Sequence, residues 1–93
     1  MSAEHRKTIT IVNRRGLHAR ASAKFVGAAA ALPDGVQAKI VKEPNEAAGG
    51  SILGLMMLGA AKGDTIELVV TGENSQAAFE ELAALIENGF GEE

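Results

Sequence analysis

The amino-acid sequence predicts an α+β fold in which three helices cover one face of a four-stranded antiparallel sheet. Residues 8–12, 36–42 and 65–71 alternate apolar and polar side chains, as strands do when only one face is buried. Two longer segments carry apolar residues at helical spacing, and 93 residues suffice for one core. Such a mixture is typical of two packed layers. The first crossover leaves room for the last strand between the first two, which predicts the strand order 1-4-2-3.

The N-terminal half is predicted to contain two strands and one helix. In residues 8–12, Ile9 and Ile11 share one face, and residues 14–16 end the strand. A helix is expected over residues 19–32, before the turn sequence LPDG. Its apolar stripe consists of Ala21, Phe25, Ala28, Ala29 and Leu32. The second strand follows over residues 36–42.

A short strand and a short helix are expected in the middle of the chain. The strand lies near residues 46–48 and ends at the double glycine that follows. Ser51 then precedes the apolar run ILGLMMLGA, which is typical of a helix with a serine N-cap. Gly59 or Gly63 ends this helix.

The last strand and the last helix complete the sheet and its cover. In residues 65–71 the apolar side chains alternate, as expected for a strand with one wet face. Asn74 or Ser75 can cap the helix, and Gly89 follows its end. Its apolar stripe consists of Ala78, Phe79, Leu82, Leu85 and Ile86.

Composition excludes several classes of function. The chain has no cysteine, and its two histidines form no cluster with carboxylates at metal-ligand spacing, so we expect neither a metal nor a cofactor. A net charge of −3 and the lack of Trp and Tyr argue against nucleic-acid binding. The N-terminus has no apolar signal segment, and no run is long enough for a membrane span. We therefore expect a cytoplasmic protein with one domain over residues 1–93.

His18 is the strongest candidate for chemistry, because it lies where a loop becomes a helix. The first turn of a helix has free N–H groups and a partial positive charge, so it attracts phosphate. The same field disfavours an imidazolium and leaves a neutral nucleophile, while the Arg20 guanidinium can approach a phosphoryl group on the ring. Gly16 permits the tight turn that exposes His18. Leu17 is expected to be an exposed apolar residue that contacts a partner.

The spacing around His18 leaves other interpretations open. The ring could serve only as an N-cap, or the helix terminus could hold an anion without covalent chemistry. A stand-alone hydrolase fits less well, because Asp34 and Asp64 are the only aspartates that could orient the histidine and both lie in predicted turns. His5 is expected to lie in a frayed N-terminal segment.

Two motifs resemble a known family. GLHARASAKF, residues 16–25, resembles the active-site segment of HPr, the histidine-containing phosphocarrier family of the bacterial phosphoenolpyruvate-dependent phosphotransferase system. GGSILGLMMLGA, residues 49–60, is similar to the second signature of that family, around its regulatory serine. The motifs stand in the family's order and at about its usual distance, and the resemblance covers nearly the whole chain. It implies an HPr-like open-faced sandwich with the fourth strand between the first and second.

The resemblance also implies a function. In this family a histidine accepts a phosphoryl group from phosphorylated enzyme I and passes it to an EIIA-type acceptor, without stand-alone turnover. His18 would then be phosphorylated at Nδ1, and Arg20 would stabilise the phosphoryl group. Ala21 stands where most members have proline, which leaves open whether the carrier serves sugar uptake or the nitrogen-related regulatory branch. We expect a monomer.

The second motif implies regulation and docking. Ser51 matches the serine that an HPr kinase/phosphorylase modifies in many members. In the family, this helix and the histidine loop form one docking surface. Helical spacing turns Leu55 and Leu58 inward with one methionine. The residues predicted to contact partners are Leu17, Ile52, Leu53 and Met56. A phosphate on Ser51 would place charge beside this apolar group and weaken docking.

Overall fold

Four strands form a single antiparallel sheet in the computed structural model, which describes residues 3–92. The strands are β1 (Glu4–Thr10), β2 (Gln37–Lys42), β3 (Asn45–Ala48) and β4 (Thr65–Thr71). Their order is β1-β4-β2-β3, and every neighbouring pair is antiparallel. The predicted insertion of the last strand between the first two is therefore confirmed.

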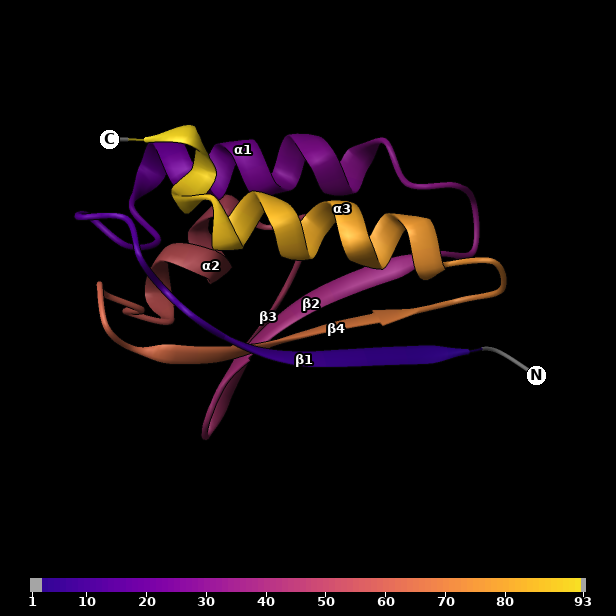
Figure 1. The fold of residues 1–93 in the computed structure, drawn as a ribbon, viewed down its shortest axis with the longest axis horizontal. Helices are drawn as coiled ribbons and strands as arrows, with labels where there is room; N and C mark the ends of the chain where they lie inside the picture. The colour runs from indigo at the N-terminus through magenta and orange to yellow at the C-terminus, as the bar shows by residue number, and fades with distance from the viewer. Residues whose placement is uncertain (1–2, 93) are drawn as a thin grey trace.

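Three helices cover one face of the sheet and leave the other face open (Figure 1). They are α1 (Ala19–Ala30), α2 (Ile52–Met57) and α3 (Gln76–Glu87), and a short 3-10 turn, η1 (Gly89–Gly91), follows α3. Helices α1 and α3 run beside each other over the sheet, and α2 packs against α1 and β3. No helix in the part of the chain described is long and apolar enough to cross a membrane.

The core lies between the two layers and follows the predicted alternation. On β4, Leu68 and Val70 point toward the helices and are fully buried. Phe25 from α1 and Ile86 from α3 meet them in the same cluster. Because apolar burial contributes roughly 25 cal/mol per Å², this aliphatic layer with its few aromatic rings is the main source of stability.

The first strand begins earlier than predicted. His5, expected in a frayed terminus, is paired with Val70 of β4. Its ring stacks on Phe79 of α3 with 5.3 Å between ring centroids. Lys7, two residues further along the same face, forms an ion pair with Glu87 at 2.6 Å. The expectation for His5 was wrong because the polar residues of this strand reach α3, so their side chains have partners that simple alternation does not reveal.

Candidate functional site

His18 is the N-cap residue of α1, as predicted. Its backbone is extended, and its carbonyl accepts the first helical hydrogen bond, from the amide of Ser22 at 2.9 Å. The backbone N–H of Arg20 donates to His18 Nδ1 at 3.3 Å. The imidazole side chain is 20% exposed. One ring nitrogen is thus directed at the free amides of the helix while an edge of the ring remains open to solvent.

A tight turn places His18 at the helix entrance. The N–H of Gly16 donates to the Asn13 carbonyl at 3.2 Å, and Gly16 has a φ of +61°. A Cβ atom at this position would lie 2.2 Å from the Ala60 oxygen. The turn therefore requires glycine both for its left-handed backbone and for its close approach to the segment that follows α2.

Leu17 does not belong to an exposed docking surface, and that prediction was wrong. Its side chain is only 4% exposed and lies in the core cluster. The Leu17 N–H donates to the Ala60 carbonyl at 3.0 Å, and its own carbonyl accepts from the Ser22 hydroxyl at 3.2 Å. With both backbone groups held, the side chain turns inward. Leu17 continues the stripe of Ala21 and Phe25 at four-residue spacing, which is the signal that could have predicted its burial.

Sequence reasoning missed a carboxylate beside the histidine. Glu92 Oε2 lies 2.6 Å from His18 Nε2, and Glu92 Oε1 accepts a hydrogen bond from Asn13 Nδ2 at 3.1 Å. Burial raises the pKa of Glu92, but the hydrogen bonds from Asn13 and His18 and the charges of His18 and Lys24 outweigh it. The pKa therefore lies below its ordinary value, and the carboxylate faces His18 in its charged form.

The turn after α3 carries Glu92 to this position. Gly89, Phe90 and Gly91 all have positive φ, so the chain reverses in a left-handed turn. The Phe90 ring is fully buried in the core, and its carbonyl accepts a hydrogen bond from Lys24 Nζ of α1 at 2.7 Å. The turn is thereby fixed against α1, with the side chain that follows it beside His18.

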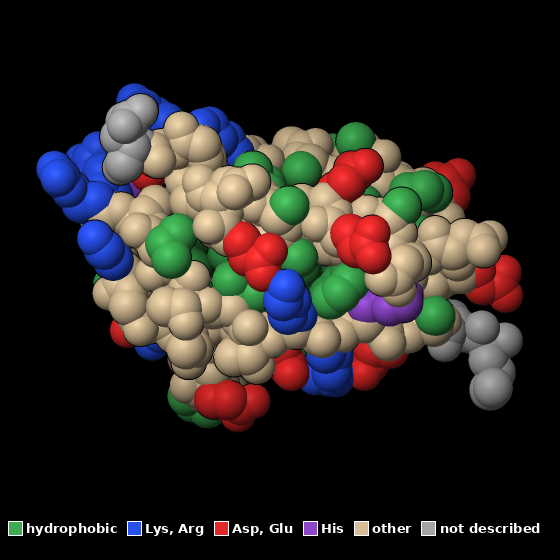
Figure 2. Space-filling view, in the orientation of Figure 1, with side chains coloured by type: hydrophobic (Ala, Val, Ile, Leu, Met, Phe, Trp, Pro, Cys, Tyr) green, Lys and Arg blue, Asp and Glu red, His purple; other side chains and the backbone are tan. Residues whose placement is uncertain are grey.

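Three arginines surround the histidine. The side chains of Arg14, Arg15 and Arg20 line one surface depression together with His18 and Glu92. Figure 2 shows Lys and Arg side chains gathered at the end of the molecule where the C-terminal turn lies. Among residues 3–92, none of these three guanidinium groups forms an ion pair with a carboxylate. The depression can therefore accept an added anion despite the net negative charge of the chain.

Ser51 is the N-cap of α2, as predicted. Its hydroxyl oxygen accepts a hydrogen bond from the Gly54 N–H at 2.9 Å. The side chain is partly exposed. This bond satisfies one free amide of the short helix, so the serine has a structural role whether or not it is modified.

Helix α2 exposes an apolar surface. Leu55 and Leu58 are buried as predicted, but no methionine accompanies them, which corrects that detail. A helix of six residues has one buried side, and the two methionines fall outside it. We call the exposed group the α2 patch; its residues and exposed fractions are Ile52 (41%), Leu53 (67%), Met56 (40%) and Met57 (75%).

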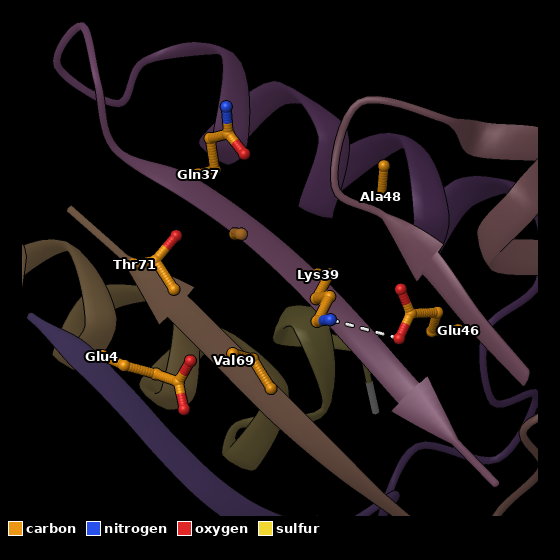
Figure 3. A pocket seen from close by; sticks show the side chains of 8 residues that line it. Glu4, Gln37, Lys39, Glu46, Ala48, Val69 and Thr71 are labelled. Carbon is orange, nitrogen blue, oxygen red and sulfur yellow. Dashed lines mark hydrogen bonds and ion pairs between the residues drawn. The ribbon is translucent and has the colours of Figure 1, made fainter. Parts of the chain in front are cut away.

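A second depression lies on the open face of the sheet (Figure 3). Buried Val69 forms part of its floor. The charges at its rim are mixed, and Lys39 Nζ donates to Glu46 Oε1 across two strands at 3.1 Å. Neither histidine lines it. Within the described residues no group of His, Cys, Asp or Glu side chains could hold a metal ion.

The family model and the relatives place the chain in a class of small phosphoryl carriers. The family model "PTS HPr component phosphorylation site" matches residues 5–88. The phosphocarrier protein HPr of Pseudomonas aeruginosa is 45% identical over 85 residues, which cover 90% of this chain and 92% of the relative. The phosphocarrier protein NPr of Shewanella violacea is 37% identical over 86 residues, with 92% of each chain covered. The structure of HPr-C-His from Thermoanaerobacter tengcongensis has a TM-score of 0.86 and 37% identity, covering 96% of this chain and 98% of that chain.

The chain therefore belongs to the HPr family of the phosphotransferase system. It is a phosphoryl carrier rather than a stand-alone enzyme. Membership implies the partners that are general to this system, enzyme I and an EIIA-type protein.

Proposed function

We propose that His18 accepts the phosphoryl group from phosphorylated enzyme I at Nδ1 and passes it to an EIIA-type acceptor. The observation that carries this assignment is the position of the ring at the N-cap of α1. Nδ1 faces the Arg20 amide at 3.3 Å, a long contact that an incoming phosphoryl group can replace. The phosphoryl oxygens would then meet the free amides of the first turn.

Arg20 supplies the main charge opposite the phosphoryl group. Arg20 lines the same depression as His18, together with Arg14 and Arg15. A planar guanidinium can donate two parallel hydrogen bonds to phosphate oxygens. Arg20 is therefore the residue that neutralises the phosphoryl group, while Arg14 and Arg15 attract acidic partner surfaces before contact.

The α2 patch is the apolar part of the docking surface. The histidine loop and the exit of α2 are tied by the hydrogen bond from the Leu17 N–H to the Ala60 carbonyl at 3.0 Å. The α2 patch and the loop that carries His18 thus lie on connected segments. Exposed methionines suit a surface that meets several partners, because their side chains adapt in shape. Leu17 contributes by holding the loop rather than by touching the partner.

Ser51 is a site for an HPr kinase/phosphorylase. Its partly exposed hydroxyl precedes Ile52 and Leu53, both members of the α2 patch. A phosphate there would be tolerated at the start of α2, but it would set two negative charges beside apolar contact residues. Modification would weaken docking and leave the fold intact.

The carrier acts as a cytoplasmic monomer with one domain over residues 1–93. Its greater identity to an HPr, 45%, than to the NPr compared above, 37%, favours the general over the nitrogen-related branch. The output is sugar uptake or phosphotransferase-linked regulation, depending on the acceptor that receives the group.

Incubation with phosphoenolpyruvate and catalytic enzyme I tests the assignment. Intact mass should show one added phosphoryl group that acid removes. His18→Ala should abolish it, whereas His5→Gln, which alters the other histidine, should keep it. No mass gain with an active enzyme I would contradict the carrier, and anion binding retained by His18→Gln would favour a non-covalent binding domain.

A further inference from the structure

The Glu92 carboxylate is held from two sides. Asn13 Nδ2 donates to Glu92 Oε1 at 3.1 Å, and the same amide nitrogen donates to the Gly16 carbonyl at 2.8 Å. The second carboxylate oxygen lies 2.6 Å from His18 Nε2. The Glu92 side chain is only 16% exposed. A carboxylate oriented by a buried amide is a fixed partner for the ring rather than a chance surface contact.

The two ring contacts select one tautomer of His18. Nδ1 receives a hydrogen bond from the Arg20 N–H, so it must carry a lone pair and no proton. Nε2 faces a carboxylate, which can only accept, so Nε2 must carry the proton. The neutral ring is thus the Nε2–H form, with its nucleophilic lone pair on Nδ1.

We propose that Glu92 is a positioning residue, which holds His18 in the tautomer that reacts at Nδ1 and balances the charge of the phosphorylated ring. This inference rests on the proposed phosphorylation of His18 and adds a role for the C-terminal turn.

Both steps, the phosphorylation of His18 and the transfer of the phosphoryl group to the acceptor, require a proton on Nε2. When enzyme I phosphorylates the carrier, the Nδ1 lone pair forms the N–P bond. The bond between phosphorus and the donor atom of enzyme I breaks, and its electron pair stays on that donor atom. The ring becomes a phosphoimidazolium whose positive charge faces Glu92. When the group leaves for the acceptor, the N–P electron pair returns to Nδ1 and the leaving group is a neutral imidazole. No proton has to move in either step.

The hydrogen-bond pattern makes Glu92→Gln more than a loss of charge. The Asn13 amide must keep its donor directed at residue 92, so a glutamine oxygen would face Asn13 and its NH2 group would face His18. The glutamine NH2 group would favour Nε2 as an acceptor, in competition with the Arg20 N–H, which favours an unprotonated Nδ1. The fraction of the Nδ1–H form, which lacks the reactive lone pair, should therefore rise. Glu92→Ala lacks both groups and leaves the ring without a fixed partner.

The ¹⁵N chemical shifts of the neutral His18 ring report the tautomer directly. The wild-type protein should be in the Nε2–H form, and Glu92→Gln should raise the Nδ1–H fraction. Phosphoryl transfer from enzyme I should fall about tenfold in kcat in both Glu92 variants, the size expected for one hydrogen bond to a charged group, while KM stays within about twofold. Glu87→Gln is the matched control, since it makes the same change in a carboxylate that pairs with Lys7 on the sheet.

Two results would overturn the inference. One is an unchanged tautomer in both Glu92 variants; the other is a wild-type rate of transfer in both. If wild-type protein accepts no phosphoryl group, the proposed function fails, yet the nitrogen shifts still decide whether Glu92 sets the tautomer. Both variants should fold, because Phe90 rather than Glu92 fixes the turn in the core.

Discussion

Gly16→Ala tests whether the loop that presents His18 depends on a left-handed glycine. An alanine Cβ would lie 2.2 Å from the Ala60 oxygen and 2.8 Å from Ala61 Cα. Both are backbone atoms, so the loop itself has to move. A left-handed backbone costs an L-residue about 1–2 kcal/mol. Loss of the hydrogen bond from the Leu17 N–H to Ala60 adds about 1 kcal/mol, for a total of about 2–3 kcal/mol.

Thermal unfolding measures this effect, with Gly27→Ala as the matched control. For a domain of this size 1 kcal/mol corresponds to about 4–8 °C, so the Tm of Gly16→Ala should fall by roughly 8–24 °C. A Cβ at Gly27 meets no atom within 4 Å, and alanine there should stabilise α1 by about 0.5–1 kcal/mol. At a temperature where both variants are folded, only Gly16→Ala should accept the phosphoryl group more slowly. A Tm for Gly16→Ala at or above that of the wild type would refute the argument.

Three further predictions concern the turn after α3 and the start of α2. Phe90→Ala removes a fully buried ring and should lower the free energy of unfolding, measured in urea, by about 3–5 kcal/mol. The contact between Glu92 and His18 should also disappear from NMR spectra. A decrease in the free energy of unfolding under about 1 kcal/mol would show that the ring does not anchor the turn. Ser51→Ala removes the acceptor for a helix amide and should cost about 1 kcal/mol while leaving phosphorylation of His18 at wild-type extent by intact mass; a variant that no longer accepts the phosphoryl group at His18 would contradict the capping and regulatory role given to Ser51. The lowered pKa of Glu92 means that its contact stabilises the fold above the ordinary carboxyl pKa of 4.5 and is lost as pH falls through the lower folded value. In an NMR titration the contact between Glu92 and His18 should persist at pH 4.5; its release at a clearly higher pH would count against a lowered Glu92 pKa.

The layers of the fold follow from patterns that act over a few residues. Alternation on β4 and helical spacing on α1 and α3 each reflect the side that packs in the core, so the sequence predicts these elements within a residue or two. The wet face expected of β4 is only partly right, because Val69 on that face is buried. The N-caps at His18 and Ser51 are equally local, because each side chain bonds an amide two or three residues ahead. His5 was placed wrongly because its partners lie on distant elements, β4 and α3. Met56 is exposed as predicted, and only the expectation that one methionine of α2 faces inward was wrong.

The four-residue spacing of Leu17, Ala21 and Phe25 is a local signal for the burial of Leu17, but it does not reveal what holds the loop. A leucine in a loop beside a reactive histidine suggests a contact residue when only its immediate neighbours are considered. The loop is held by the Ala60 carbonyl, which accepts a hydrogen bond from the Leu17 N–H, and the Leu17 side chain lies in the same core cluster as Phe25. Ala60 lies 43 residues after Leu17 in the sequence, and no short-range pattern connects the two residues.

For Glu92, the sequence predicts the turn that precedes the residue but not the position of its side chain. A glycine after a helix, followed by an apolar residue, is typical of a helix end that folds back on itself, so the burial of Phe90 was predictable from Gly89-Phe90. The destination of Glu92 was not, because it depends on how α3 lies against α1 and on the bond from Lys24 to the Phe90 carbonyl. Since 74 positions separate Glu92 from His18, only the tertiary structure brings the carboxylate to the ring. Because the bond from Lys24 and the packing of α3 against α1 hold Glu92 in place, any change that loosens the turn from α1 should affect His18 in the same way as a substitution of Glu92.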